Sequence, residues 1–351
     1  MIVRYPEIDL NTIYKNMYGV VCFGEVAQLL HGYYSKYGKI FRLTDCEVRK
    51  DQRIEGFSRA LQRFVIIERE AVRPLISSKE VDDFIAADLQ DYSTYLITAD
   101  HNDPDFKYAY PLTAKYLMES LQEIGHDYLD EIETVVRPSI REAMNKRKLI
   151  VSTTNDICHA MLDEKTHLVP TVGGSYLCTF PENDRRRIVG YMAILNSRTF
   201  SYIFNVIMHD HDKRVVGPRS VLQEMPVPRF SKHFAILENL SDYLLYLSKP
   251  NLSPISRHIS NERIGYYLTK ILDMVVYELY FPEYVYERNL NAIEYIESAP
   301  FMNSEVVDEE PIWETYLWFQ RPENVVRQMI EVLDTRSPEL LYKIQQFNQN
   351  E

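Results

Sequence analysis

The sequence predicts an α+β protein, in which a mixed-sheet domain over residues 1–232 precedes a mostly helical domain over residues 233–351. Short segments rich in β-branched and aromatic residues recur up to Pro228, bounded by glycine and proline, and are typical of strands. After Pro228, apolar residues recur in steps of three and four, which indicates helices buried along one face. The length of 351 residues exceeds one typical domain and favours the division into two.

The first 172 residues combine strand segments with a few helices. We expect a short helix over Glu68–Ile76, which Pro74 would start or kink, and an amphipathic helix over Ala109–Glu133. Arg137–Lys148 is predicted to be a basic helix or turn. The strand segments are Ile40–Thr44, Arg63–Ile67, Leu149–Thr153 and Ala160–Leu162.

The central stretch over residues 176–230 is predicted to be a strand, a long helix, a polar loop and a second strand. Tyr176–Phe180 has the composition of a strand, and Asn183 or Asp184 can cap the helix that follows. Apolar residues recur from Ile188 to Ile207 and predict one helix of about 20 residues, about 30 Å long. The polar loop covers residues 209–220, and two prolines then bound a short extended segment over residues 221–229.

The C-terminal part is predicted to be helical. Pro282 ends the second of its helices, because proline cannot continue an α-helix. The predicted helices are Phe234–Leu247, Arg263–Tyr280, Glu323–Leu333 and Pro338–Gln346. A linker rich in serine, proline and asparagine separates the first two, over residues 251–260.

Composition and charge exclude some classes of protein. No apolar run approaches about 18 residues, so we expect no membrane span, and the four cysteines, which form no close pair, favour reduced thiols in the cytoplasm over a zinc site. The net charge of −12 argues against nucleic acid, but residues 80–133 concentrate 14 acids, and basic clusters lie elsewhere. One basic face and charges scattered over all sides are both compatible with this pattern.

Three segments resemble a known family. Leu195-Asn196-Ser197 on a helix before a Met225-Pro-Val-Pro228 strand, Glu70–Phe84 followed by Tyr95–Ile97, and the Asp273–Tyr280 helix occur in the family's order. In these segments the chain resembles the TaqI-like C-terminal specificity domain. This domain recognises the DNA target in adenine-N6 methyltransferases, in type IIG restriction–modification enzymes and in BREX-type phage-defence methyltransferases. The resemblance also places an entry strand at residues 18–24, where Val21 and Cys22 depart from its usual small polar residues.

The resemblance implies DNA sequence recognition without chemistry in this chain. The family's catalytic part carries Asn-Pro-Pro-Tyr and a glycine-rich loop for S-adenosylmethionine, and neither occurs here. We therefore expect no catalytic residue, no metal and no cofactor in this chain, with S-adenosylmethionine only on a catalytic partner. The expected partners are double-stranded DNA and a methyltransferase or endonuclease subunit or domain. The alternative class is an acidic interaction scaffold that docks a partner or mimics DNA.

The candidate DNA contacts are basic residues on turns and loops. Arginine and lysine neutralise phosphates, and arginine can also bind guanine through two hydrogen bonds. The competing interpretation is a solvated helix end, in which Arg185, Arg186 and Arg187 pair with nearby acids. The candidates are Lys146, Arg147, Lys148, Arg185, Arg186, Arg187, Lys213, Arg214 and Arg219.

Three other motifs are compatible with a catalytic or metal-binding site. Pro104-Asp105 and Asp163-Glu164-Lys165 loosely match the order Pro-Asp…Asp-x-Lys of restriction nuclease folds. A metal-dependent nuclease subunit is therefore a second alternative. His209-Asp-His-Asp212 offers metal ligands, although the tip of a polar loop is the simpler interpretation. Asn196 and Ser197 are expected to bond backbone groups where a helix packs on a sheet, rather than to catalyse a reaction.

Overall fold

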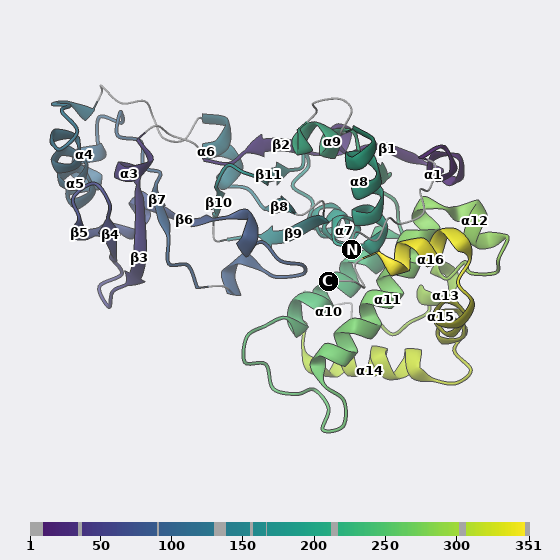
Figure 1. Ribbon diagram of the computed structural model, residues 1–351. Coiled ribbons are helices and arrows are strands. Elements are labelled where there is room, and N and C mark those ends of the chain that lie inside the picture. Colours follow the sequence, from purple (N-terminus) through teal and green to yellow (C-terminus); the bar gives the residue numbers. More distant parts are fainter. Residues whose placement is uncertain are drawn as a thin grey trace, which may run out of the picture.

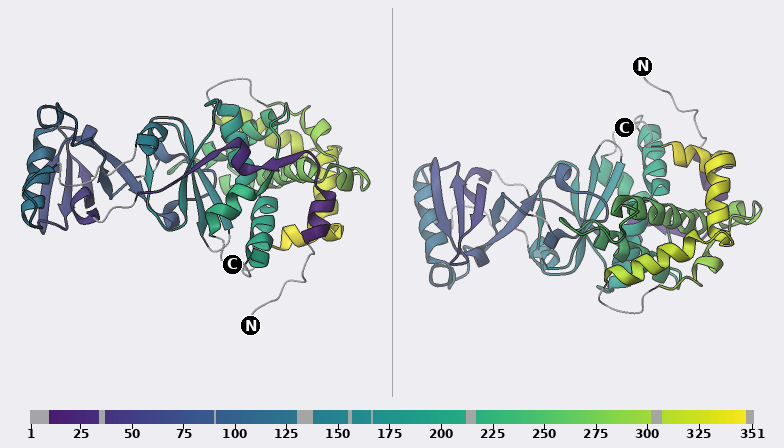
Figure 2. Two further views of the ribbon diagram at one scale, coloured as in Figure 1. Left: turned by 90° about the horizontal axis from the view of Figure 1, so that it is seen from above. Right: turned by 90° about the horizontal axis from the view of Figure 1, so that it is seen from below.

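The computed structural model describes residues 10–33, 37–89, 91–129, 138–154, 157–165, 167–211, 217–301 and 307–347. These residues form an elongated molecule with three parts in a row: a six-stranded sheet with its helices, a four-stranded sheet, and a group of helices (Figures 1 and 2). Helices and strands occur together with mixed sheets, so the predicted α+β class is confirmed.

The six-stranded sheet has the strand order β10-β6-β7-β3-β4-β5. All neighbouring strands are antiparallel except β10 and β6, which are parallel. The strands are β3 (Arg42–Val48), β4 (Ile54–Ser58), β5 (Arg63–Ile67), β6 (Val72–Ile76), β7 (Tyr95–Ile97) and β10 (Val169–Pro170). The helices of this part are α3 (Gly38–Phe41), α4 (Phe106–Ala109) and α5 (Pro111–Gln122), with short 3₁₀ turns η1 (Arg69–Ala71), η2 (Ser78–Glu80) and η3 (Ala87–Leu89).

Two predictions for this part were wrong. The helix expected over Glu68–Ile76 is the turn η1 followed by strand β6, because β7 and β10 pair with it on its two sides and bury its apolar side chains. Proline is compatible with the extended backbone there and is poorly tolerated inside a helix. The long helix expected from Ala109 ends at Gln122 as α5, and Gly125 then adopts a positive φ of 79°.

The four-stranded sheet lies in the middle of the molecule and is buried on both faces (Figure 1). Its order is β2-β11-β8-β9, with every pair antiparallel. Successive residues alternate between two cores: Leu149 and Val151 face the core of the helical part, whereas Ile150 faces the core of the six-stranded sheet. The strands are β2 (Gln28–His31), β8 (Lys148–Thr154), β9 (Ile157–Asp163) and β11 (Ser175–Thr179), and helix α6 (Pro138–Met144) precedes β8.

The helix predicted from Ile188 to Ile207 is two helices, α7 (Arg185–Leu195) and α8 (Arg198–His211). Asp184 caps α7 as expected, because its carboxylate accepts from the backbone N–H of Arg186 at 3.2 Å. The break lies at Asn196 and Ser197, and the Ser197 hydroxyl accepts from the N–H of Phe200 at 3.2 Å. The expected straight span of about 30 Å is therefore wrong, because serine and asparagine offer the backbone an alternative to continuing the helix.

The Met-Pro-Val-Pro segment forms strand β12 (Pro226–Pro228), which pairs with β1 (Val20–Cys22) near the N-terminal end of the chain. Helix α9 (Pro218–Glu224) precedes β12, so part of the segment predicted as loop and strand is helical. Helices α1 (Leu10–Asn16) and α2 (Phe23–Val26) flank β1. After β1 the chain runs from the helical part to the four-stranded sheet, where β2 pairs with β11 (Figure 2).

The C-terminal helices largely match their predicted ranges. Ser260 caps α11, since its hydroxyl accepts from the N–H of Arg263 at 3.3 Å. The helices are α10 (Phe234–Leu247), α11 (Asn261–Tyr280), α12 (Pro282–Tyr286), α13 (Ile293–Ile296), α14 (Glu309–Gln320), α15 (Val325–Arg336) and α16 (Glu339–Gln346). None of the helices among the described residues combines the length and apolarity that crossing a membrane requires.

Two hydrophobic cores organise the described residues, and their border does not coincide with residue 232. One core joins the six-stranded sheet to one face of the four-stranded sheet. The other joins the opposite face to α7, α8 and the C-terminal helices, so it continues across residue 232. At that junction the backbone of Gly190 in α7 lies against the ring of Phe234 in α10, where a Cβ atom would collide with the ring.

Candidate functional site

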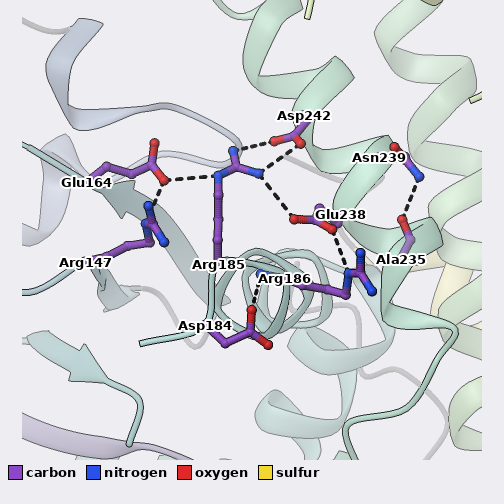
Figure 3. Close-up of polar contacts among 9 residues, drawn as sticks. All are labelled: Arg147, Glu164, Asp184, Arg185, Arg186, Ala235, Glu238, Asn239 and Asp242. Atoms are coloured by element: carbon purple, nitrogen blue, oxygen red, sulfur yellow. Dashed lines mark hydrogen bonds and ion pairs between the residues drawn. The ribbon is translucent and has the colours of Figure 1, made fainter. Parts of the chain in front are cut away.

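Arg185 at the start of α7 is the centre of an ion-pair network (Figure 3). Its guanidinium donates to both carboxylate oxygens of Asp242, at 2.7 and 3.0 Å, and through Nε to Glu164 at 3.1 Å. Glu238 lies 3.5 Å away. Burial lowers the pKa of Arg185, but the hydrogen bonds and charge of Asp242, with those of Glu164, outweigh it and raise the pKa. The charge of Arg185 is thus satisfied inside the protein.

The neighbouring arginines are also paired. The Nε atom of Arg147 lies 2.8 Å from Glu164, which Arg185 also contacts. The Nε atom of Arg186 lies 3.0 Å from Glu238 (Figure 3). Arg187 pairs with Glu182 at 3.1 Å, and its guanidinium lies 4.8 Å from the ring centre of Phe230. Arg186 retains 52% side-chain exposure, the largest of these four arginines. The described geometry therefore matches the competing interpretation, in which the arginine cluster pairs with nearby acids.

Lys148 was wrongly placed among the candidate DNA contacts. Its side chain is fully buried, and its ammonium lies 2.6 Å from Asp163 and 2.9 Å from the carbonyl oxygen of Met144. Burial lowers the pKa of Lys148, Asp163 opposes this, and the positive charge of Arg73 adds to the lowering. A lysine inside the sheet cannot reach a phosphate, because β8 and β9 place it on a buried face.

The remaining candidates differ in their surroundings. Lys146 is half exposed and pairs with Glu142 at 2.7 Å, one helical turn away. Arg219 donates to the carbonyl oxygen of Leu29 at 2.8 Å and lies 3.2 Å from His31, so it joins α9 to β2. The other two predicted contacts, Lys213 and Arg214, lie outside the described residues.

Asn196 and Ser197 bond backbone groups, as expected. The Asn196 side chain accepts from the N–H of Ala160 at 2.6 Å and donates to its carbonyl oxygen at 2.9 Å. Ala160 belongs to β9, at the edge of the four-stranded sheet, and the amide takes the place of a neighbouring strand there. The Ser197 hydroxyl donates to the carbonyl oxygen of Ile194 at 2.6 Å. Both residues are structural.

A cleft of about 850 Å³ lies where the six-stranded sheet meets the loop between β9 and β10. We call it the inter-sheet cleft. Parts of β3, η1, β6, η3, β7 and the segments before β7 and after β9 line it, and Tyr92 and Tyr95 contribute aromatic surface. Its charged lining consists of Glu47, Arg69, Glu70, Arg73, Asp88, Asp91 and Lys165.

The three cations of the inter-sheet cleft are Arg69, Arg73 and Lys165. They form no ion pairs of the kind that neutralise the predicted arginines among the described residues. Arg69 donates to the amide oxygen of Gln52 at 3.0 Å, and Arg73 donates to the carbonyl oxygens of Val72 and Glu70 at 2.9 and 3.3 Å. Among the described residues, no carboxylate forms a salt bridge with them or with Lys165. These three cations are not among the contacts predicted from the sequence, although Arg73 lies within the family-like segment Glu70–Phe84 and Arg69 directly precedes it.

In the part of the chain that the structure describes, acids of the nuclease motif are held in other contacts, and Asp212 of the metal motif lies outside the described residues. Asp163 pairs with the buried Lys148, and Glu164 is held by Arg147 and Arg185. The His209 ring lies 2.8 Å from the carbonyl oxygen of Asn205 in its own helix. No group of three histidine, cysteine or carboxylate side chains within the described ranges is arranged to hold a metal ion.

A buried carboxylate joins the two family-like segments of the helical part. Asp273 in α11 accepts from the backbone N–H of Arg198 at 3.4 Å, and the Arg198 guanidinium lies 3.7 Å from it. Burial raises the pKa of Asp273 to about 6, although the Arg198 charge and hydrogen bond lower it. Further along α11, the Tyr280 hydroxyl donates to the carbonyl oxygen of Pro226 in β12 at 2.9 Å.

No protein-family model matches this chain, and no curated protein matches it significantly.

Proposed function

We propose that this chain is the DNA sequence-recognition component of a restriction–modification or phage-defence methyltransferase system and carries no chemistry of its own. The observation that supports the proposal is the mutual contact of the family-like segments. Asp273 contacts the start of α8 directly after Leu195-Asn196-Ser197, and Tyr280 bonds the Met-Pro-Val-Pro strand at Pro226. In the other segment pair, β6 and Tyr95–Ile97 are neighbouring strands. Segments on which the resemblance rests thus contact one another across long sequence separations.

The proposal is tested by measuring the binding of the full chain to a pool of random duplexes over a series of salt concentrations. DNA recognition predicts that the affinity falls steeply with salt, because each neutralised phosphate releases counterions. It also predicts that repeated selection enriches one sequence, which a salt-dependent but unspecific polyanion binder would not do. The absence of duplex binding even at low salt would contradict the proposal.

A protein-docking scaffold is the second candidate function, and the internal pairing of the predicted basic clusters favours it. Arg185, Arg147 and Lys148 are neutralised within the protein, which leaves little free positive charge on that face. The scaffold predicts binding to a protein partner and no binding to duplex DNA. The same salt series therefore distinguishes the two candidates.

A further inference from the structure

We propose that the inter-sheet cleft is the surface that reads base edges of duplex DNA, with Arg69 and Arg73 as the residues that bind guanine. This inference rests on the proposed function and adds the place of recognition and the kind of base that is read. It replaces the turn around Arg185, whose guanidinium is occupied by Asp242 and Glu164.

The two guanidinium groups are available to bind a ligand. Arg69 bonds an amide oxygen of Gln52, and Arg73 bonds backbone carbonyl oxygens, so neither charge is neutralised by a carboxylate within the described residues. Arg73 projects from the paired strand β6, which holds its backbone rigidly. A positioned guanidinium with free donors can form the pair of hydrogen bonds that guanine O6 and N7 accept in the major groove.

The same cleft also contains carboxylates. Glu47, Glu70, Asp88 and Asp91 line it together with Arg69, Arg73 and Lys165, so the cleft is not uniformly positive. Carboxylates repel phosphates, and a surface for backbone contact alone would exclude them. In base readout they are useful, because a carboxylate accepts from the amino group of cytosine. A mixture of arginines and carboxylates is thus suited to G·C pairs, and we expect such pairs in the recognised sequence.

The test compares two double variants of the full chain. R69A/R73A removes the two guanidinium groups of the cleft. R257A/R263A removes the same charge from two exposed arginines outside the cleft lining, for which the described structure shows no salt bridge. Each protein is titrated with the duplex selected by the wild type and with a scrambled duplex of the same length. We expect R69A/R73A to lose about tenfold or more of the preference for the selected duplex, since one good arginine–guanine pair discriminates by about this factor. The control should retain the preference.

The outcomes separate the inference from the function on which it rests. If the wild type binds no duplex, the proposed function fails. If the wild type binds its selected duplex and R69A/R73A discriminates as well as R257A/R263A, the cleft is not the reading surface. Equal weakening of both duplexes by R69A/R73A would also overturn the inference, because it would show phosphate contact alone. R69K/R73K keeps the positive charges but removes the paired N–H donors of the guanidinium groups. It should lose the preference for the selected duplex while retaining most of the affinity for the scrambled duplex.

Discussion

At the level of single residues, the contacts of Arg185 depend on acids that are distant in the sequence. Three consecutive arginines before a helix are compatible with phosphate contact and with internal pairing. The partners of Arg185 lie 21 and 57 residues away, at Glu164 and Asp242. Because these acids come from a strand end and from α10, Arg185 joins the four-stranded sheet to two helices.

We predict that Arg185→Ala lowers the free energy of unfolding by about 2 kcal/mol, because it leaves two partly buried carboxylates without their shared partner. Arg186→Ala is the matched control. Arg186 is about half exposed and pairs with one carboxylate, so its loss should cost less than about 1 kcal/mol. Urea unfolding of both variants measures the difference. Equal costs for the two substitutions would show that the Arg185 network does not hold these elements together.

At the scale of elements, a single buried carboxylate couples α11 to the start of α8. Asp273 faces the N-terminal end of α8 and the guanidinium of Arg198, with Lys270, Tyr277 and Asp334 lining the same small cavity. Lys270 is paired with Asp334 at 2.7 Å. Arg198 is therefore the cation that faces Asp273, and its charge only partly offsets the cost of burying the ionised carboxylate.

The pKa of about 6 for Asp273 predicts that its contribution to stability depends on pH. The pKa is raised above the ordinary 3.8, so the stabilising contribution is fully present below about pH 4 and is lost as the pH rises through 6. The difference in unfolding free energy between wild type and Asp273→Asn should fall by about 3 kcal/mol from pH 3 to pH 7, and then stay constant. Denaturant unfolding at a series of pH values measures it. A difference that does not vary with pH would contradict the raised pKa.

At the scale of the whole molecule, the two cores share the four-stranded sheet. One face of this sheet completes the core of the six-stranded part, and the other face is covered by α7, α8 and the C-terminal helices. The inter-sheet cleft lies beside the segment that connects β9 of the four-stranded sheet to β10, and β10 pairs with β6 in the six-stranded sheet. The C-terminal helices thus cover the sheet from whose strand β9 the chain continues to Lys165 and His167, which line the cleft.

This arrangement predicts that residues 1–232 alone do not fold cooperatively. Removal of α10 and α11 would expose the apolar residues of α7 and α8, among them Tyr191, whose ring centre lies 5.1 Å from that of Phe234. We expect the full chain to show a cooperative thermal transition by circular dichroism and the fragment 1–232 to show none. A sharp transition in the fragment would establish the division at residue 232 as a true domain boundary.

Local sequence patterns predicted the fold class, most of the C-terminal helices and the strands around Arg63 and Tyr176, and they limited the cap of α7 to Asn183 or Asp184. These features depend on periodicity and on side chains that act within a few residues, and both are visible in the sequence.

The remaining features depend on the tertiary structure. It broke the central helix at Asn196, where the edge of β9 offered a partner; it placed β6 between β7 and β10; and it buried Lys148 beside Asp163. It also decided which cations are neutralised, because a salt bridge depends on distances between residues far apart in sequence. Among the described residues, Arg185 therefore pairs with carboxylates, whereas Arg69 and Arg73 in the inter-sheet cleft bond amide and carbonyl oxygen atoms.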